Sequence, residues 1–374
     1  MKMRVLEVIR QGEVGGGESH VVDLTLALRS RGNVEPIVLA FTDGPMMELL
    51  REEGVPCHVV TTQRPFDPRV YSRLKELVAS EHIDLVHAHG SRAASNMLTV
   101  CRRLGVPMVY TVHGWSFHDG QSWLSGWLRR QSERLICRRA QHVICVSQSN
   151  FRTGQEAFGL SEEKCTVIEN GVNLSRFDPD LVYPDMRTEL GFAPTDFVCA
   201  YICRITEQKG PMDFVEAMIA AHEQNPRLRA LMVGEGDMAD KVDYYINEHA
   251  REGTFVRLPF RDDVPALLAA SDAFCLPSLW EGLSIAMLEA MAMRKAMIVT
   301  YTDGARDIIQ DHRNALVVPP GRAVRLTEAL LELADSPELC TRMGQRAFAL
   351  VRQRFDAARV AEKVEEIYKL IQSK

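Results

Sequence analysis

The sequence lacks the cysteine patterns that mark metal-binding modules and disulfide-rich domains. Its nine cysteines include no CxxC pair and no Cys/His spacing of the metal-ligand kind. An odd number of scattered cysteines is typical of a reducing compartment, so the sequence predicts a cytoplasmic protein.

Long hydrophobic runs are also missing. No stretch approaches the roughly 20 apolar residues that a membrane-spanning helix needs. The apolar run within residues 1–13 is interrupted by Glu7 and is too short for a secretory signal. Any membrane contact is therefore expected to be peripheral, at the inner face of the membrane.

The sequence has no excess of positive charge. Its 44 Lys and Arg residues are outnumbered by 50 Asp and Glu residues, which gives a formal net charge of -6. A dominant basic surface is the usual requirement for binding nucleic acid, so no nucleic-acid partner is predicted. The length of 374 residues exceeds one ordinary core and favours two domains.

What the sequence does contain is short apolar runs that alternate with helical patterns. The first series comprises residues 5–9, 36–41, 57–60, 85–87, 108–112, 143–146 and 166–168. The second comprises residues 197–202, 230–233, 255–258, 273–276, 296–300 and 316–318. This alternation predicts an α/β protein with two Rossmann-like, doubly wound parallel-sheet domains that face a central cleft. The predicted domains are residues 1–180 and 181–355, and a helix within 356–374 is expected to pack back across their boundary.

The segment WEGLSIAMLEAMA places two carboxylates, Glu281 and Glu289, in largely apolar surroundings. The pattern predicts a buried helix over residues 285–293, preceded by a loop. Glu281 then lies at the start of the helix and Glu289 about two turns further on. A buried carboxylate costs several kcal/mol unless it is hydrogen-bonded or paired, so both glutamates need partners.

Two interpretations of this segment are open. In the functional one, Glu289 binds the vicinal hydroxyls of a ribose, and the amides of Gly282, Leu283 and Ser284 at the helix N-terminus favour a phosphate. In the structural one, Glu281 interacts with the helix dipole and Glu289 pairs with a structural arginine.

Two cations, Arg204 and Lys209, follow the predicted strand at residues 197–202. Ligands of open parallel sheets collect beyond the carboxyl ends of the strands. Both side chains could neutralise a diphosphate there without a metal. The alternative is an exposed strand-end arginine and a solvated lysine.

The N-terminal half offers a glycine-rich loop and a histidine as candidates. Gly15, Gly16 and Gly17 precede a helix predicted from about residue 20 to residue 31, and they would let backbone amides approach a phosphate or sugar closely. A plain turn explains them equally well, because no GxGxxG fingerprint fits. His113 follows the strand at 108–112 and is a candidate to face the cleft, with a structural histidine as the alternative.

Two further patterns are similar to metal sites but are interpreted otherwise. His87 and His89 share one face of a strand end, where they could contact an acceptor, but no third ligand is evident. The DPD triplet formed by Asp178, Pro179 and Asp180 lies between the domains and is typical of a turn. No metal and no cofactor are predicted.

Residues 123–139 form a basic and aromatic segment. Such a helix could lie on an anionic membrane surface. The alternative is a domain helix with a solvated arginine face. This interpretation is favoured because the strand at 143–146 needs a covering helix.

Taken together, these residues resemble the retaining GT-B-fold glycosyltransferases of family 4, the group 1 glycosyltransferases. The resemblance covers nearly the whole chain, and its most specific part is the E-x7-E motif from Glu281 to Glu289. The further matches are CRITEQKG, MVGEGD, FRDDVPALLAASDAFCLPS, VIENGVNLSRF and the glycine-rich loop.

The resemblance implies retaining, metal-independent transfer of a hexose from a nucleotide diphosphate-sugar to a hydroxyl of a glycan or lipid-linked acceptor. A UDP-sugar is favoured and a GDP-sugar is the alternative donor. The implied setting is the synthesis of cell-envelope polysaccharide. A GT-B-like sugar-nucleotide epimerase and a non-catalytic sugar-nucleotide-binding protein are the alternative functions.

The resemblance also implies roles for single residues. Arg204 and Lys209 would bind the diphosphate, and Glu289 the ribose. Glu281 would act on the donor sugar with the amides of Leu283 and Ser284. His113 and the loop Gly15, Gly16 and Gly17 would contribute from the N-terminal domain. The base would lie near Gly234, Phe260 and Arg261.

Three positions depart from the family pattern. Arg294 stands where a glycine is usual after the helix, and it would be strained in a left-handed conformation. Asp303 replaces one glycine of a common pair, and Cys203 replaces the glycine before Arg204. These changes leave both glutamates and both cations in place.

Overall fold

The computed structural model describes residues 2–13, 15–117 and 122–373. The chain divides into two compact units. Unit 1 comprises residues 1–171 together with 357–374, and unit 2 comprises residues 172–356. The stretch 172–180, which we expected in the first domain, therefore groups with unit 2, and the last helix groups with unit 1.

Unit 1 is built on a parallel sheet that has seven strands within the described residues. The strands are β1 (Met3–Ile9), β2 (Val34–Ala40), β3 (Cys57–Val59), β4 (Leu85–His89), β5 (Met108–Val112), β6 (His142–Cys145) and β7 (Cys165–Val167). Their order is β3-β2-β1-β4-β5-β6-β7, so the direction of winding reverses between β1 and β4. Ligands of doubly wound sheets bind beyond the strand ends at such a switch point.

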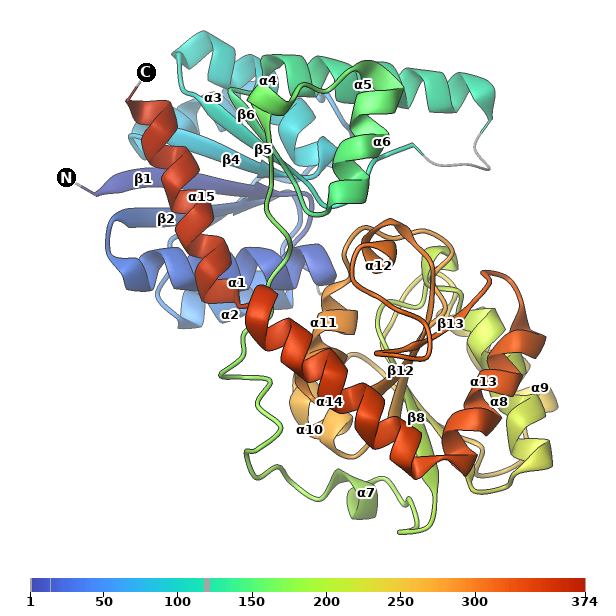
Figure 1. Cartoon of the computed structure of the whole chain (residues 1–374). Coiled ribbons are helices and arrows are strands. Elements are labelled where there is room, and N and C mark those ends of the chain that lie inside the picture. The colour runs from blue at the N-terminus through green and yellow to red at the C-terminus, as the bar shows by residue number, and fades with distance from the viewer. Residues whose placement is uncertain (1, 14, 118–121, 374) are drawn as a thin grey trace. The chain divides into compact units, whose positions relative to one another are not determined.

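Helices cover both faces of this sheet. They are α1 (Gly16–Arg31), α2 (Pro45–Glu52), α3 (Tyr71–Ser80), α4 (Ser91–Leu104), α5 (Trp123–Arg139), α6 (Gln148–Phe158) and α15 (Ala357–Gln372), with a 3-10 turn η1 (Glu162–Lys164) before β7. Figure 1 shows α15 beside α1, and apolar residues of both helices pack on one face of the sheet. Residues of α3 and α4 form the core on the opposite face.

Unit 2 repeats the plan with a parallel sheet of six described strands. The strands are β8 (Phe197–Ile202), β9 (Leu228–Val233), β10 (Phe255–Leu258), β11 (Ala273–Leu276), β12 (Ala296–Thr300) and β13 (Leu316–Val318). Their order is β10-β9-β8-β11-β12-β13, which places the switch point between β8 and β11.

The helical elements of unit 2 are α7 (Met186–Glu189), η2 (Glu207–Lys209), α8 (Pro211–Gln224), α9 (Ala239–His249), α10 (Val264–Ala269), α11 (Ile285–Ala292), α12 (Asp303–Arg306), α13 (Ala323–Asp335) and α14 (Pro337–Arg354). Apolar residues of α8 and α13 join strand residues in one core, and α14 packs along α11 and β12 (Figure 1). The core helix α11 is short and largely buried, as its apolar sequence predicted.

Each predicted apolar run forms a strand, and the prediction of two parallel α/β sheets is confirmed. The start of α1 was predicted wrongly. It begins at Gly16 and not near residue 20, so Gly16 and Gly17 form the first helical turn. Glycine is a weak helix former, which is why the sequence pattern did not reveal this turn.

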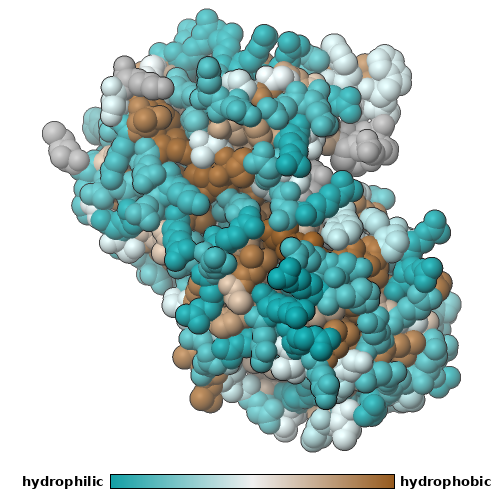
Figure 2. Space-filling view, viewed as in Figure 1, coloured by the Kyte–Doolittle hydropathy of each residue, from teal (hydrophilic) through white to brown (hydrophobic). Residues whose placement is uncertain are grey.

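The surface drawn in Figure 2 is mostly hydrophilic, with hydrophobic patches between polar side chains. Within the described residues, none of the helices has both the length and the hydrophobicity needed to span a membrane.

Candidate functional site

The switch point of unit 2 brings together the residues that the sequence singled out. Arg204 and Lys209 follow β8, and Glu281 lies in the segment that follows β11. Because β8 and β11 are parallel neighbours, their carboxyl ends lie at the same edge of the sheet. The predicted cations and the first predicted carboxylate therefore lie at one site.

Lys209 and Glu281 form an ion pair between the Lys209 ammonium and Oε2 of the glutamate. Their side chains are only 9% and 14% exposed. The amide of Gln208 donates to the carbonyl oxygen of Trp280 at 3.0 Å, and the Ser278 hydroxyl lies 3.5 Å from the same Oε2 of Glu281. The loops after β8 and β11 are thus joined by a partly buried polar network.

This network shows a partner of Glu281 that the sequence interpretations did not name. Glu281 precedes α11 by four residues, and Ser284 is the N-cap of the helix. The carboxylate of Glu281 is ion-paired with Lys209. Glu289 lies half-buried within α11, and Leu283 and Ser284 are buried at its start.

Close backbone approaches hold the two loops together. Gly210 has φ +61°, and a Cβ atom there would lie 2.3 Å from the carbonyl oxygen of Pro277. A side chain at this position would therefore separate the Lys209 turn from the β11 loop. Gly304 makes a similar contact, since its Cβ position lies 2.3 Å from the carbonyl oxygen of Gly282.

The predicted base-binding residues lie at the neighbouring strand ends. Gly234 follows β9, and its amide donates to the carbonyl oxygen of Leu258 at 3.2 Å, which places it beside the end of β10. A Cβ atom at Gly234 would lie 2.1 Å from the carbonyl oxygen of Cys203. Phe260 is 37% exposed just beyond β10, and the Arg261 guanidinium is ion-paired with Asp263.

Cys203, one of the departures from the family pattern, is a half-buried neighbour of this site. Burial raises the pKa of its thiol to about 11, so the thiol is neutral at physiological pH. Its side chain adds no charge beside Arg204 and Lys209.

Unit 1 places the glycine-rich loop and His113 at its own switch point. The loop follows β1, and Gly15, Gly16 and Gly17 form the N-cap and first turn of α1. His113 follows β5 directly and is half-buried. His89, at the end of β4, lies between them, with its Nδ1 3.1 Å from Nε2 of His113.

A buried polar cluster extends below His113. Glu7 of β1 accepts from Nε2 of His89 at 2.7 Å and from the Tyr368 hydroxyl at 2.9 Å. His87 lies 2.5 Å from the same hydroxyl through Nδ1. His20 of α1 packs edge-on to His113, with ring centroids 4.9 Å apart.

The expectation that His87 and His89 contact an acceptor directly is wrong. Their side chains are fully buried, because α1 and α15 cover this face of the sheet. Their role is internal to unit 1.

Burial governs the ionisation of the cluster. It lowers the pKa of His20 to about 3 and the pKa of His89 to about 4, and it holds the pKa of His113 well below the usual range. Burial alone would raise the pKa of Glu7, but the interactions with His87 and His89 outweigh it and lower that pKa. At neutral pH the Glu7 carboxylate therefore lies in a cluster with the neutral imidazoles of His20, His89 and His113.

No third ligand-type residue near His87 and His89 was evident from the sequence, but the structure brings several together. Possible ligand atoms of His20, His89 and His113 lie within 4.8 Å of one another, as do those of Glu7, His87 and His89. Both ring nitrogens of His89 are already used in hydrogen bonds, which account for the cluster without an ion. The absence of a metal stays a prediction.

Sequence reasoning missed Glu7, His20 and Tyr368 as partners of His113. One signal was available for Glu7, because a charged residue inside a buried parallel strand requires a polar partner. No signal linked Tyr368 to β1, since 361 residues separate it from Glu7.

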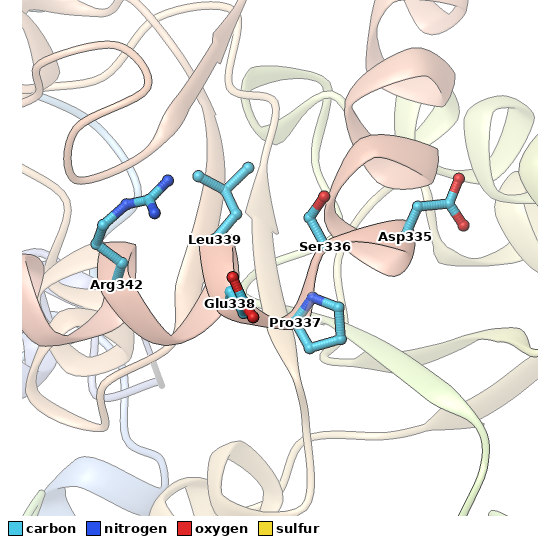
Figure 3. Close-up of a pocket in the computed structure, with 6 residues that line it drawn as sticks. All are labelled: Asp335, Ser336, Pro337, Glu338, Leu339 and Arg342. Carbon is cyan, nitrogen blue, oxygen red and sulfur yellow. The ribbon is translucent and has the colours of Figure 1, made fainter.

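Another hollow, at the junction of α13 and α14, lies elsewhere in unit 2. Figure 3 shows its lining residues, which are Asp335, Ser336, Pro337, Glu338, Leu339 and Arg342. None of them belongs to the predicted site, and they lie away from the strand ends that carry Arg204 and Glu281.

Family models match the two halves of the chain in succession. The model for Glycosyltransferase Family 4 matches residues 14–176, and the model for Glycosyl transferases group 1 matches residues 182–349. The chain belongs to the group 1 glycosyltransferases of family 4. Two relatives of this glycosyltransferase illustrate the match.

One relative is the UDP-Gal:alpha-D-GlcNAc-diphosphoundecaprenol alpha-1,3-galactosyltransferase of Escherichia coli. It is 28% identical over 309 residues, which cover 79% of this chain and 77% of the relative. The other is the GDP-mannose-dependent monoacylated alpha-(1-6)-phosphatidylinositol monomannoside mannosyltransferase of Corynebacterium glutamicum, 28% identical over 314 residues that cover 80% of each chain.

Among solved structures, Anabaena Alr3699/HepE in complex with UDP and glucose is similar with a TM-score of 0.85. The match covers 98% of this chain and 99% of that one at 24% sequence identity, and it supports the fold alone. The glycosyltransferase has a GT-B fold, and the predicted fold and family are confirmed.

Proposed function

We propose that this glycosyltransferase moves a hexose from a nucleotide diphosphate-sugar to a hydroxyl of a glycan or lipid-linked acceptor, with retention of anomeric configuration and without a metal. The observation that carries the proposal is the pairing of Lys209 with Glu281 at the switch point of unit 2, beside Arg204. This geometry sets positive charge next to a carboxylate, as a site for a diphosphate joined to a sugar requires.

The two cations would act on the leaving group. When the bond between the anomeric carbon and the phosphate oxygen breaks, negative charge builds on the diphosphate. Fixed positive side chains stabilise that charge in place of a metal ion. Lys209 is held by Glu281, so its ammonium is already positioned at the strand end before the donor arrives.

The carboxylates would hold the two sugars of the donor. Glu289, half-buried in α11, would bind the ribose hydroxyls, and the amides at the start of α11 would favour the phosphate. Glu281, with the amides of Leu283 and Ser284, would position the transferred sugar. Its pairing with Lys209 suits electrostatic support of the sugar better than nucleophilic attack.

Unit 1 would supply His113 and the loop formed by Gly15, Gly16 and Gly17. The acceptor hydroxyl would attack from the face that the diphosphate leaves, and the leaving phosphate would take its proton. The base would lie near Gly234, Phe260 and Arg261. A UDP-sugar is the favoured donor and a GDP-sugar the alternative, and the relatives named above include both donor types by name.

We also propose peripheral contact with an anionic membrane through α5, which would suit a lipid-linked acceptor in cell-envelope polysaccharide synthesis at the inner face of the membrane. Trp123 is 81% exposed, and Leu124, Trp127 and Leu128 are more than half exposed. Exposed arginines follow them on the same helix. Aromatic and basic side chains on one exposed helix favour a membrane interface.

Calorimetry with UDP and GDP tests the donor site. We expect Arg204→Ala to weaken binding of the preferred diphosphate by about 10- to 100-fold, since a hydrogen bond to a charged group is lost. The matched control is Arg346→Ala on an exposed face of α14. Unchanged affinity in Arg204→Ala would remove this residue from the site.

Product analysis then separates the candidate reactions. Transfer predicts a glycosylated product only when an acceptor is present, with the donor's anomeric configuration retained. An epimerase would convert the sugar nucleotide without acceptor, and a binding protein would give no product. Loss of activity on treatment with a chelator would contradict the metal-independent mechanism.

A further inference from the structure

The polar cluster of unit 1 lies in the layer between the sheet and the helices α1 and α15. Glu7, His87 and His89 project from β1 and β4 toward this layer, as their apolar neighbours Val5 and Leu85 do. Tyr368 of α15 reaches the same point and is fully buried. The layer is apolar toward the amino ends of the strands and polar toward their carboxyl ends.

The hydrogen bonds of the cluster determine where its protons lie, beginning at Glu7. An ionised carboxylate can only accept, so the Tyr368 hydroxyl donates to Oε1 and the Nε2–H of His89 donates to Oε2. The Tyr368 hydroxyl has one proton and gives it to Glu7. The Nδ1 of His87 must therefore donate to the hydroxyl oxygen.

The next bond fixes the proton on His113. Burial keeps His89 neutral, with a pKa of about 4, so a ring that is protonated at Nε2 carries a lone pair at Nδ1. That lone pair faces Nε2 of His113 at 3.1 Å, so His113 donates from Nε2. His113 is also neutral, and its Nδ1 is left as a hydrogen-bond acceptor.

We propose that Glu7 is a positioning residue that acts through His89 to fix His113 in the Nε2–H tautomer, with Nδ1 presented as an acceptor for a sugar hydroxyl. This inference rests on the proposed function, in which His113 contacts the donor sugar. The hydrogen bonds that link Glu7, His89 and His113 determine that Nδ1 of His113 accepts a hydrogen bond and does not donate one. Without it, a neutral imidazole chooses between two tautomers.

The cluster also explains why a charge is kept in the core of unit 1. A buried carboxylate is unfavourable unless several hydrogen bonds satisfy it. Glu7 accepts such bonds from Tyr368 and His89, and the Nδ1 of His87 lies 3.1 Å from its Oε2. A neutral acceptor at position 7 could not serve all of these donors at once.

Nitrogen NMR of the wild-type protein tests the proposal directly. With histidine-selective ¹⁵N labelling, we expect His89 and His113 each to show one neutral tautomer, protonated at Nε2, at pH 7. A His113 ring protonated at Nδ1, or one that populates both tautomers, would overturn the proposal. This result does not depend on any variant or on activity.

The variant Glu7→Gln tests the link to transfer. The amide presents one acceptor atom where the carboxylate presents two, so His89 and His113 should populate both tautomers. We expect kcat to fall about tenfold or more, while KM for the donor changes little, because orientation and not affinity is lost. A single His113 tautomer with wild-type kcat in this variant would contradict the mechanism.

Tyr368→Phe is the matched control, because it removes one bond to Glu7 from the same buried cluster but leaves the bond between Glu7 and His89. The His113 tautomer should stay single in this variant. A separate variant, His113→Ala, tests the proposed function. Normal transfer by His113→Ala would remove His113 from the reaction, whereas the wild-type spectra would still decide whether Glu7 fixes its tautomer.

Discussion

At the scale of single residues, the proposed donor site contains a carboxylate that is ion-paired without any ligand. The ammonium group of Lys209 is paired with Glu281, and neither side chain is more than 14% exposed. Removing one partner of such a pair leaves an uncompensated charge, which is strongly unfavourable when it is buried. A diphosphate that binds here therefore has to contact Lys209 together with Glu281, or displace Glu281 from Lys209.

This arrangement predicts separable effects of substitution at Glu281. We expect Glu281→Ala to reduce transfer by about 100-fold or more, because the electrostatic support of the sugar is lost in the transition state. The affinity for the nucleotide diphosphate should be retained, since Lys209 is then released toward the phosphates. Initial rates and calorimetry on the same preparation measure both quantities.

Glu207→Ala serves as the control for this experiment, because Glu207 is exposed in the same turn as Lys209. It should leave both rate and affinity near their wild-type values. Normal turnover by Glu281→Ala would show that the carboxylate has no part in transfer.

The meeting of the proposed donor-site residues at one sheet edge was predictable from the sequence, and the histidine cluster was not. Arg204, Lys209 and Glu281 follow apolar strands of unit 2, so a parallel sheet brings them to one edge. Glu7 lies within a strand, and its neighbours come from β4 and α15. Which strands adjoin in a sheet depends on long-range packing that no local pattern in the sequence records.

At the scale of elements, α5 differs between its two ends. Its C-terminal half packs into the core through Ile136 and Cys137, as expected of a helix that covers the sheet. Its N-terminal half exposes Trp123 and Trp127. The interpretation as a covering helix is therefore confirmed for the C-terminal half, and contact with a membrane is a proposal for the exposed N-terminal half.

The exposed half of α5 predicts binding to anionic vesicles. We expect the double substitution Trp123→Ala and Trp127→Ala to weaken cosedimentation with vesicles that contain anionic lipid, because both rings would enter the interface. Binding of the wild-type protein should also weaken as salt is raised, since arginines contribute. Tyr244→Ala is the control, since this aromatic residue is 67% exposed on α9.

Equal sedimentation of the wild-type protein and the double variant would argue against α5 as the contact. Sedimentation with neutral vesicles alone would argue against the electrostatic part. In the first case the exposed tryptophans would need another partner.

The turn after α11 shows how an element tolerates a departure from the family pattern. Arg294 adopts φ +54°, the left-handed conformation in which the sequence predicted strain. Its guanidinium makes two hydrogen bonds to Asp180, at 2.6 and 2.8 Å, and lies over the ring of Phe348. These contacts offset the strain of the left-handed conformation. They also show that Asp180 is a partner of Arg294 in the turn after α11.

At the scale of the whole molecule, the two sheets could be predicted because parallel strands are buried on both faces. Such strands read as continuous apolar runs, and each run found in the sequence became a strand. The order of strands within each sheet and the return of α15 to unit 1 could not be predicted. Both depend on which apolar surfaces meet after the chain has turned, as Val360 and Val364 of α15 do on the sheet of unit 1.

The buried histidines predict how the stability of unit 1 depends on pH. The pKa values of His20 and His89 fall from an ordinary 6.5 to about 3 and about 4 on folding. As the pH falls, these histidines are therefore protonated in the unfolded chain before they are protonated in the folded one. Their contribution to the free energy of unfolding is complete above pH 6.5 and is lost as the pH falls from there toward 4. Each histidine should contribute a slope of about 1.4 kcal/mol per pH unit in that window.

The contribution of Glu7 to stability changes in a lower pH range. Its folded pKa lies below the ordinary value of 4.5, so its contribution is present above pH 4.5 and lost only below it. Of this cluster, the histidines and not Glu7 therefore lower the stability between pH 6.5 and 4.5. Denaturant unfolding at a series of pH values in this range measures the slope.

The substitution His20→Gln isolates the contribution of one histidine to the pH dependence of stability, because glutamine does not titrate. We expect it to reduce the slope of the unfolding free energy against pH by about 1.4 kcal/mol per pH unit, because one proton fewer is taken up on unfolding. His249→Gln is the control, because His249 is exposed on α9, and its slope should equal that of the wild type. If His20→Gln also keeps the wild-type slope, His20 is not held neutral by burial, and the acid sensitivity of unit 1 must come from other groups.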